Sequence, residues 1–238
     1  GSGLLVGAIV ADALFGKLTH RMISAVMGFG GGVLIAVVAT ELIGERVSDD
    51  LGPTAVIALL AGAAIFSGAN FYLSRRGAKN RKRCGECTEQ PREGEQHGSG
   101  AAIALGSVLD GIPEAMVIGM SVANGGAISV AVIAGFFLAN VPQGLSSTSG
   151  MKVAGRSRRY IFTIWIGIPL LVGISAALGN LLFGSADTQA PAILSFAAGA
   201  VIAMLAEAMI PEAFEKAPPF IGFITVVGFL AAYLIAQH

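Results

Sequence analysis

Residues 110–114 read Asp-Gly-Ile-Pro-Glu, and residues 139–143 read Ala-Asn-Val-Pro-Gln. Each segment lies inside an apolar run long enough to cross a lipid bilayer. A proline inside a helix removes one backbone hydrogen bond, here from the carbonyls of Leu109 and Leu138. Polar side chains are costly in hydrocarbon. Two such breaks in neighbouring helices are typical of a substrate site near the middle of a transporter.

The composition indicates a membrane protein. The chain has 238 residues, of which 54% are hydrophobic and only 13% are charged. Its mean hydropathy is +0.75. Soluble domains carry about 25% charged residues, so a water-soluble domain is not indicated.

Apolar runs of about 20 residues predict eight membrane-spanning helices in a single all-α domain. They are expected near residues 3–16, 23–45, 52–74, 99–122, 126–150, 160–182, 190–212 and 218–236. The first run is short for a span, and the opening Gly-Ser-Gly indicates a truncation, so we expect the first helix to be incomplete.

The basic residues fall in alternate connections between these runs. Of the 15 Lys and Arg residues, only Arg46 lies outside the connections that follow the first, third, fifth and seventh runs. The positive-inside rule makes those connections cytoplasmic, including the basic loop 75–98, and both termini extracytoplasmic in a plasma (inner) membrane. The Arg75–Arg83 run would also attract anionic membrane lipid, whereas nucleic-acid binding is not indicated.

An internal repeat organises the spans. Residues 29–45, FGGGVLIAVVATELIGE, align without gaps with residues 196–212, FAAGAVIAMLAEAMIPE, at an offset of 167. The match pairs the second span with the seventh, so the two copies have opposite orientation in the membrane. The sequence thus predicts a 3+2+3 arrangement: three-helix repeats at 3–74 and 160–236 flank the central kinked pair at 99–150. A chance match between small apolar helices is the alternative.

This order of elements resembles the ZIP family of divalent metal transporters, over essentially the whole chain. In that family the fourth and fifth spans carry a His-Asn-x-Pro-Glu-Gly pattern or a close variant. The proline and the acid stand in matching places here at Pro113 and Glu114, and Pro142 stands in the fifth span. The seventh span also resembles the family's acid-bearing Pro-Glu helix. The resemblance implies a transporter of zinc or iron and a homodimer.

The resemblance also implies a set of metal ligands, of which this chain keeps part. The family's fourth-span His falls on Asp110 and its Glu on Glu114, while the fifth-span Asn or Asp falls on Asn140 and the Glu on Gln143. The seventh-span acid is best matched by Glu207. Because one of the two bridging glutamates is replaced by Gln143, we expect one metal site rather than two.

The residues themselves point to an oxygen-ligand site. Asp110 and Glu114 are four residues apart and Asn140 and Gln143 three apart, so each pair shares a helix face. Glu207 could add a third carboxylate, with Glu41 and Ser147 as weaker candidates. The expected spans contain no Cys or His. Oxygen ligands favour manganese, iron(II), magnesium or calcium, so the choice between these and zinc stays open.

Each candidate also has a structural interpretation. Intramembrane acids can pair within a helix bundle, and Asn140 and Gln143 can serve as interhelical hydrogen-bond partners. Asp12 could lie at an entrance or simply at a membrane boundary. Glu45 and Glu212 fall at helix ends, where an exposed acid is expected.

The basic loop 75–98 contains a further candidate metal-binding site. Cys84 and Cys87 form a CxxC pair, with His97 nearby. A closed zinc site usually has four ligands, so this pair alone is weak and a solvated loop is the alternative.

The sequence therefore predicts a transporter that moves a divalent cation toward the cytoplasm by alternating access. Alternatives are a transport-inactive ZIP-like protein that binds or senses metal, and a carrier of a different cation. An enzyme is not expected, because one helix supplies both Asp110 and Glu114 and no Ser/His or His-rich cluster accompanies them.

Overall fold

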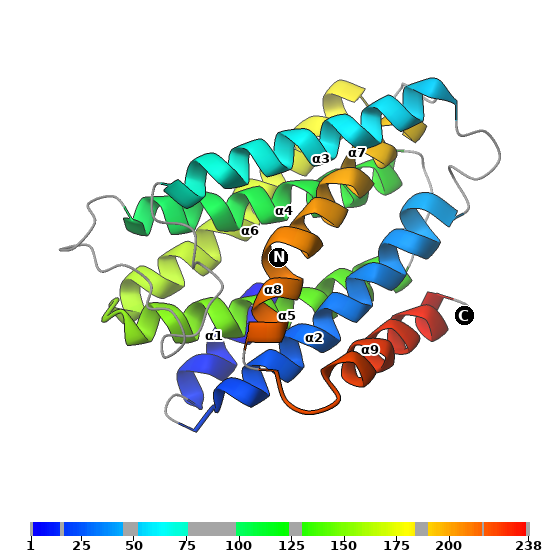
Figure 1. The fold of residues 1–238 in the computed structure, drawn as a ribbon. Coiled ribbons are helices and arrows are strands. Elements are labelled where there is room, and N and C mark those ends of the chain that lie inside the picture. The colour runs from blue at the N-terminus through cyan, green and yellow to red at the C-terminus, as the bar shows by residue number, and fades with distance from the viewer. Residues whose placement is uncertain are drawn as a thin grey trace.

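The computed structural model describes residues 2–14, 17–44, 52–75, 99–123, 130–183, 190–215 and 217–236. All regular structure in these ranges is helical, which confirms the expected all-α class. Figure 1 shows the helices side by side in one bundle. Their bounds are α1 Ser2–Ala13, α2 His20–Val37, the π-helical η1 Val38–Gly44, α3 Pro53–Leu73, α4 Ser99–Ala123, α5 Val130–Val153, α6 Arg158–Phe183, α7 Ala190–Met204, the π-helical η4 Leu205–Met209, α8 Ile210–Glu215 and α9 Ile221–Ala236.

A helix occupies each of the eight expected segments, because α2 continues into η1 and α7 continues through η4 into α8. Capping and turn residues explain why some helix ends differ from the expected bounds. Ser157 accepts a hydrogen bond from the Tyr160 backbone N–H (3.2 Å), so α6 begins at Arg158. Gly155, with φ of +77°, lies in the turn that follows α5.

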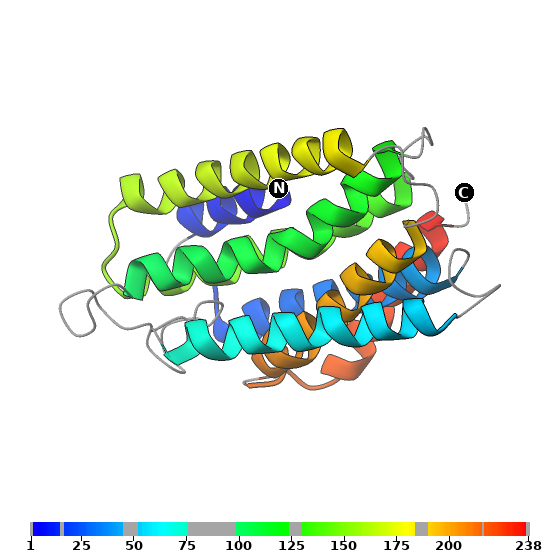
Figure 2. The same cartoon turned by 90° about the horizontal axis from the view of Figure 1, so that it is seen from above.

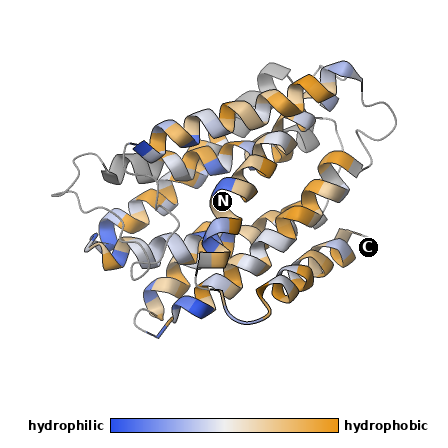
Figure 3. Cartoon of the chain, viewed as in Figure 1, coloured by the Kyte–Doolittle hydropathy of each residue, from blue (hydrophilic) through white to orange (hydrophobic). Residues whose placement is uncertain are grey.

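Three helical stretches in the described residues are long and apolar enough to cross a membrane: His20–Thr40, Pro53–Leu73 and Pro191–Phe214. α1 and α9 are apolar but shorter. The outward faces are also apolar: Ile57 and Leu60 of α3 are more than half exposed, as is Phe223 of α9. Hydrophobic colours run the length of α9 (Figure 3). Large exposed apolar surfaces of this kind are rare in soluble monomers.

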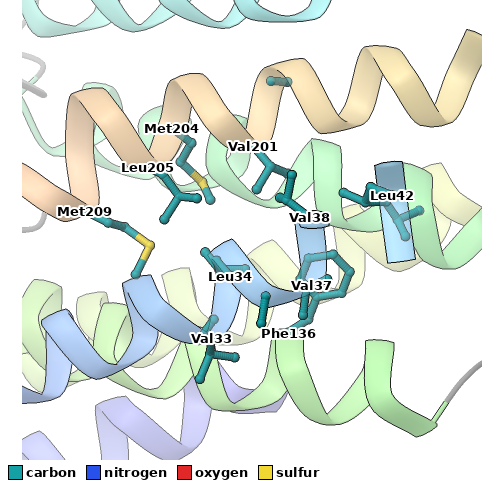
Figure 4. Close-up of a cluster of buried hydrophobic side chains, with 14 of the residues drawn as sticks. Val33, Leu34, Val37, Val38, Leu42, Phe136, Val201, Met204, Leu205 and Met209 are labelled. Carbon is teal, nitrogen blue, oxygen red and sulfur yellow. The ribbon is translucent and has the colours of Figure 1, made fainter. Parts of the chain in front are cut away.

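The helices form two layers, seen edge-on in Figure 2. In the first layer α1 packs against α5, and α4 packs against α6. In the second layer α3 packs against α7, and α2 packs against α9. Contacts of α2 with α5 and of α4 with α7 join the layers. Figure 4 shows apolar side chains of α2, α5 and α7 meeting there, among them Leu34, Phe136 and Val201.

The α3–α7 crossing depends on two glycines. A Cβ atom added at Gly62 would lie 1.9 Å from the carbonyl oxygen of Phe196. One added at Gly199 would lie 1.9 Å from the carbonyl oxygen of Leu59. The backbones therefore approach too closely for any larger residue, as in membrane helices packed through small residues.

The α2–α9 crossing has the same construction. A Cβ at Gly32 would lie 1.9 Å from the Thr225 carbonyl oxygen, and one at Gly228 would lie 2.1 Å from that of Phe29. The four residues of this crossing stand 166 or 167 positions from those of the α3–α7 crossing, with Phe29 matching Phe196 and Gly32 matching Gly199.

The π-helical segments η1 and η4 also correspond, and Ser74 and Arg75 after α3 are π-helical as well. η1 begins at Val38 and η4 at Leu205, again 167 residues apart. η1 follows α2, and η4 lies between α7 and α8, so both belong to the second layer. Short π-helical segments inside α-helices are frequent at functional sites.

We expect Gly199→Ala to lower the melting temperature of the purified protein, because the added carbon must push α3 away. Overpacking of this kind costs about 1–3 kcal/mol. Gly167→Ala in α6 is the matched control: nothing lies within 4 Å of its added Cβ. That variant should be neutral or slightly stabilising, since glycine within a helix is about 0.5–1 kcal/mol worse than alanine. Equal melting temperatures for the two variants would contradict the close crossing.

Candidate functional site

The candidate site lies between α4 and α5, each of which contains a proline, Pro113 and Pro142. Asp110 and Glu114 occupy successive turns of α4 and are 3% and 5% exposed. Asn140 and Gln143 of α5 are similarly buried. Burial of four polar side chains in an apolar bundle requires polar partners.

The two helix faces meet at Glu114 and Asn140. Nδ2 of Asn140 donates a hydrogen bond to Oε2 of Glu114 at 2.5 Å. The same nitrogen donates to the carbonyl oxygen of Phe136 at 2.7 Å. Both bonds use the amide nitrogen, which leaves the amide oxygen of Asn140 as an acceptor. The predicted convergence of the α4 and α5 faces is therefore present at this pair.

A small cavity lies beside this bond. Its volume is about 10 Å3, roughly the space that one water molecule or one monatomic ion needs. All of its walls come from helices of the first layer. The lining residues are Leu4, Asp110, Gly111, Asn140, Gln143, Ser147 and Trp165.

Oxygen-bearing side chains dominate the polar part of this lining. Asp110 supplies a carboxylate, Asn140 and Gln143 supply amides, and Ser147 supplies a hydroxyl. Glu114 is not part of the lining and reaches the cavity through Asn140. Such a set suits a hard cation better than a soft one.

Trp165 holds α6 against the site. Its indole N–H donates to the Thr148 hydroxyl at 2.7 Å, and the side chain is 1% exposed. The ring therefore forms a fixed apolar wall of the cavity.

Glu207, expected to join this group, makes its hydrogen bonds elsewhere. Ser67 Oγ donates to Oε1 of Glu207 at 2.5 Å, and Asn70 Nδ2 donates to Oε2 at 2.8 Å. Both donors belong to α3. Glu207 itself lies in η4 and is exposed. The structure thus places this carboxylate in a second polar cluster between α3 and η4.

The prediction for Glu212 was wrong. Its side chain is 7% exposed rather than solvated, and it accepts a hydrogen bond from the buried hydroxyl of Ser146 in α5. The helical run continues to Glu215, so residue 212 is not at its end. The sequence did contain an indication that Glu212 is buried, because Pro211-Glu212 repeats the Pro113-Glu114 pair.

Gln143 also faces the second layer. Its Nε2 donates to the sulfur of Met209 at 3.5 Å. This is a weak bond, since a thioether is a poor acceptor. Through this contact the amide nitrogen of Gln143 points toward η4.

Asp12, expected to lie at an entrance or at a membrane boundary, is paired with two basic side chains. It forms an ion pair with Lys152 at 2.5 Å and a second with Arg158. These contacts tie the end of α1 to the end of α5 and the start of α6.

The remaining candidates lie beyond what the structure describes. The side chain of Glu41 and residues Cys84, Cys87 and His97 are outside the described part of the chain. Within that part, no three His, Cys, Asp or Glu side chains gather in one place. A cation at the α4–α5 cavity would therefore depend on amide and hydroxyl oxygens as well as on carboxylates.

No protein-family model matches the chain, and no curated protein matches it significantly. The expected resemblance to the ZIP family therefore rests on the order of the elements and on the motifs around Pro113, Pro142 and Pro211.

We expect Glu212→Ala to lower the melting temperature, because it removes a buried acceptor of the Ser146 hydroxyl. Loss of a buried partner costs about 1–3 kcal/mol. Glu212→Gln keeps an acceptor oxygen at the same place and should lose less. If Glu212→Ala melts at the temperature of the parent protein, the buried contact does not contribute to stability.

Proposed function

We propose that this protein is an integral membrane transporter that moves a divalent cation toward the cytoplasm through the α4–α5 site. One observation carries the proposal: the buried Glu114–Asn140 bond lies beside an ion-sized cavity lined by Asp110 and Gln143. Buried acids within apolar helices are expensive and mark ion pathways by default. Asp110 and Glu114 together would balance the charge of a divalent ion.

The proposed architecture has eight spans arranged as two inverted three-helix repeats around α4 and α5. The matching glycine crossings, at offsets of 166 and 167 residues, support the repeat. The π-helical segments that begin at Val38 and Leu205 support it as well. The alternation of basic connections supports cytoplasmic placement of the α3–α4 and α5–α6 connections.

Binding would exchange the two hydrogen bonds of the Asn140 amide nitrogen, to Glu114 and to the Phe136 carbonyl oxygen, for several ion–oxygen contacts. A cation arriving at the cavity would displace the Asn140 amide nitrogen from Glu114. Rotation of that amide would then offer its oxygen to the ion, next to the Glu114 carboxylate. Asp110 and the oxygen of Gln143 would complete the binding face. The cost of removing water from the ion would be offset by these contacts.

Release would follow from movement of the two layers. All the cavity walls belong to the first layer, while α2, α3, α7 and α9 form the second. Rocking of one layer against the other would expose the same site to one side of the membrane and then the other.

Two considerations bear on which ion the site would bind, and they favour different sets of metals. The oxygen ligands of the described site favour manganese, iron(II), magnesium or calcium. The ZIP resemblance favours zinc or iron. Iron(II) satisfies both, and a panel of metals would decide.

A transport-inactive metal-binding protein is the second candidate. It is favoured by Gln143 standing where the family has a glutamate, and by the hydrogen bonds of Glu207 going to α3. Such a protein would bind a cation without moving it across a membrane.

We expect Glu114→Ala to abolish uptake of manganese(II), iron(II) or zinc(II) into vesicles that contain the purified protein, and to abolish the thermal shift caused by the ion. The variant removes one of the two carboxylates at the site. Glu207→Ala is the control and should retain the thermal shift, because Glu207 bonds to α3. Unchanged uptake by Glu114→Ala would exclude the site. A thermal shift in the parent protein without uptake would favour the second candidate.

We expect Gln143→Glu to bind divalent cations more tightly by roughly tenfold or more. Two unit charges about 4 Å apart interact by about 1 kcal/mol in bulk water and by about 4 kcal/mol at an effective dielectric constant of about 20. Titration calorimetry in detergent would measure the change, with Gln143→Leu as the comparison that removes the amide oxygen. Equal affinity in the parent and both variants would remove Gln143 from the binding face.

A further inference from the structure

A second and much larger cavity lies within the second layer, between α2, the η4–α8 run and α9. Its volume is about 200 Å3. Nothing in the proposed transport site uses it. The residues that line it are Met27, Gly28, Gly31, Met209, Ile210, Ala213, Phe214, Gly222 and Thr225.

The side chains that line this cavity are almost all apolar. Its only side-chain hydroxyl, that of Thr225, donates to the carbonyl oxygen of Ile221 in its own helix (3.1 Å). None of the described residues that line the cavity is charged. Cavities of this kind stay free of water and accept apolar guests; one of about 150 Å3 is large enough for benzene.

The cavity opens on the outer surface of the bundle. Ile210 and Phe214 are 38% and 50% exposed, and they form its rim. Met27 and Met209 are fully buried and form its floor. Two of its three walls belong to helical stretches that can span a membrane, His20–Thr40 and Pro191–Phe214. The medium outside such walls is hydrocarbon, so a hydrocarbon chain is the occupant that both the lining and the setting fit.

We propose that this cavity binds an acyl chain of a membrane lipid, and that the chain acts on the cation site through Met209. The first part rests on the membrane placement in the proposed function, and the second also rests on the cation site. Met209 links the two cavities: its side chain lines the large one, and its sulfur accepts the hydrogen bond from Gln143. A chain pressing on Met209 would hold η4 in place and with it the orientation of the Gln143 amide. Without the chain, methionine is free to change rotamer.

Gly31 gives a direct way to fill the cavity. It is a lining residue, and nothing lies within 4 Å of a Cβ atom added there. Gly31→Leu would therefore place a side chain in the space of the lipid chain without displacing backbone. Gly222→Leu would do the same from α9. Gly173→Leu is the matched control, because Gly173 also has open space but lies on α6, away from the cavity.

The first experiment counts bound lipids. The full chain is reconstituted with palmitoyl-oleoyl phosphatidylglycerol, transferred to detergent and examined by native mass spectrometry. We expect the parent protein and Gly173→Leu to retain one lipid molecule more than Gly31→Leu and Gly222→Leu. Equal retention by all four proteins would overturn the acyl-chain site, whatever the protein transports.

The second experiment measures the coupling. The affinity for manganese(II) is determined for delipidated protein with and without added phosphatidylglycerol. We expect added lipid to change the affinity of the parent by roughly 5-fold or more, the lower end of typical coupling between sites, and to leave Gly31→Leu unchanged. An unchanged affinity in the parent, with lipid retained, would overturn the action through Met209. Failure of every variant to bind any divalent ion would instead exclude the proposed cation site, without affecting the lipid count.

Discussion

The hydrogen bond between Asn140 and Glu114 joins α4 and α5, each of which contains an internal proline. A carboxylate in an apolar interior is strongly unfavourable unless a polar group faces it. Leaving one partner of a buried hydrogen bond unsatisfied costs about 1–3 kcal/mol, and more when that partner is charged. The bond therefore fixes how α4 and α5 lie against each other. α1 and α6 then cover the outer sides of this pair, with Leu4 and Trp165 closing the small cavity. Asp110, Gln143 and Ser147 line that cavity together with Asn140.

Packing within a layer differs from packing between layers. Within layers, glycines bring backbone against backbone: a Cβ at Gly7 of α1 would meet the Val141 carbonyl oxygen at 2.1 Å, and Gly199 is equally close to α3. Between layers, glycines face side chains, as at Gly30 against Pro142 and Gly135 against Val37. Backbone contacts resist sliding, whereas side chains can change rotamer. Most glycine contacts within a layer thus differ in kind from those between layers, although Gly28 meets the side chain of Ile221 within the second layer.

Much of the fold could be predicted from the sequence, because apolar runs of span length have few structural solutions. The burial of Asp110, Glu114, Asn140 and Gln143 followed from prolines and polar residues inside such runs. The partners of Glu207 could not be predicted, because Ser67 and Asn70 lie 140 and 137 residues away and no local pattern links them. Glu212 was wrongly expected to be exposed at a helix end, because the helix continues beyond the end of the apolar run.

The π-helical segments η1 and η4 have a consequence for the history of the chain. A π-helical turn accommodates one more residue than an α-helical turn, and such turns are rare. The segments that begin at Val38 and Leu205 occupy matching positions, which favours a common origin for them. If one ancestral three-helix segment was copied to make both halves, the insertion came first and the copying second. The divergence of Thr40, which bonds to its own helix, from Glu207, which bonds to α3, then came later.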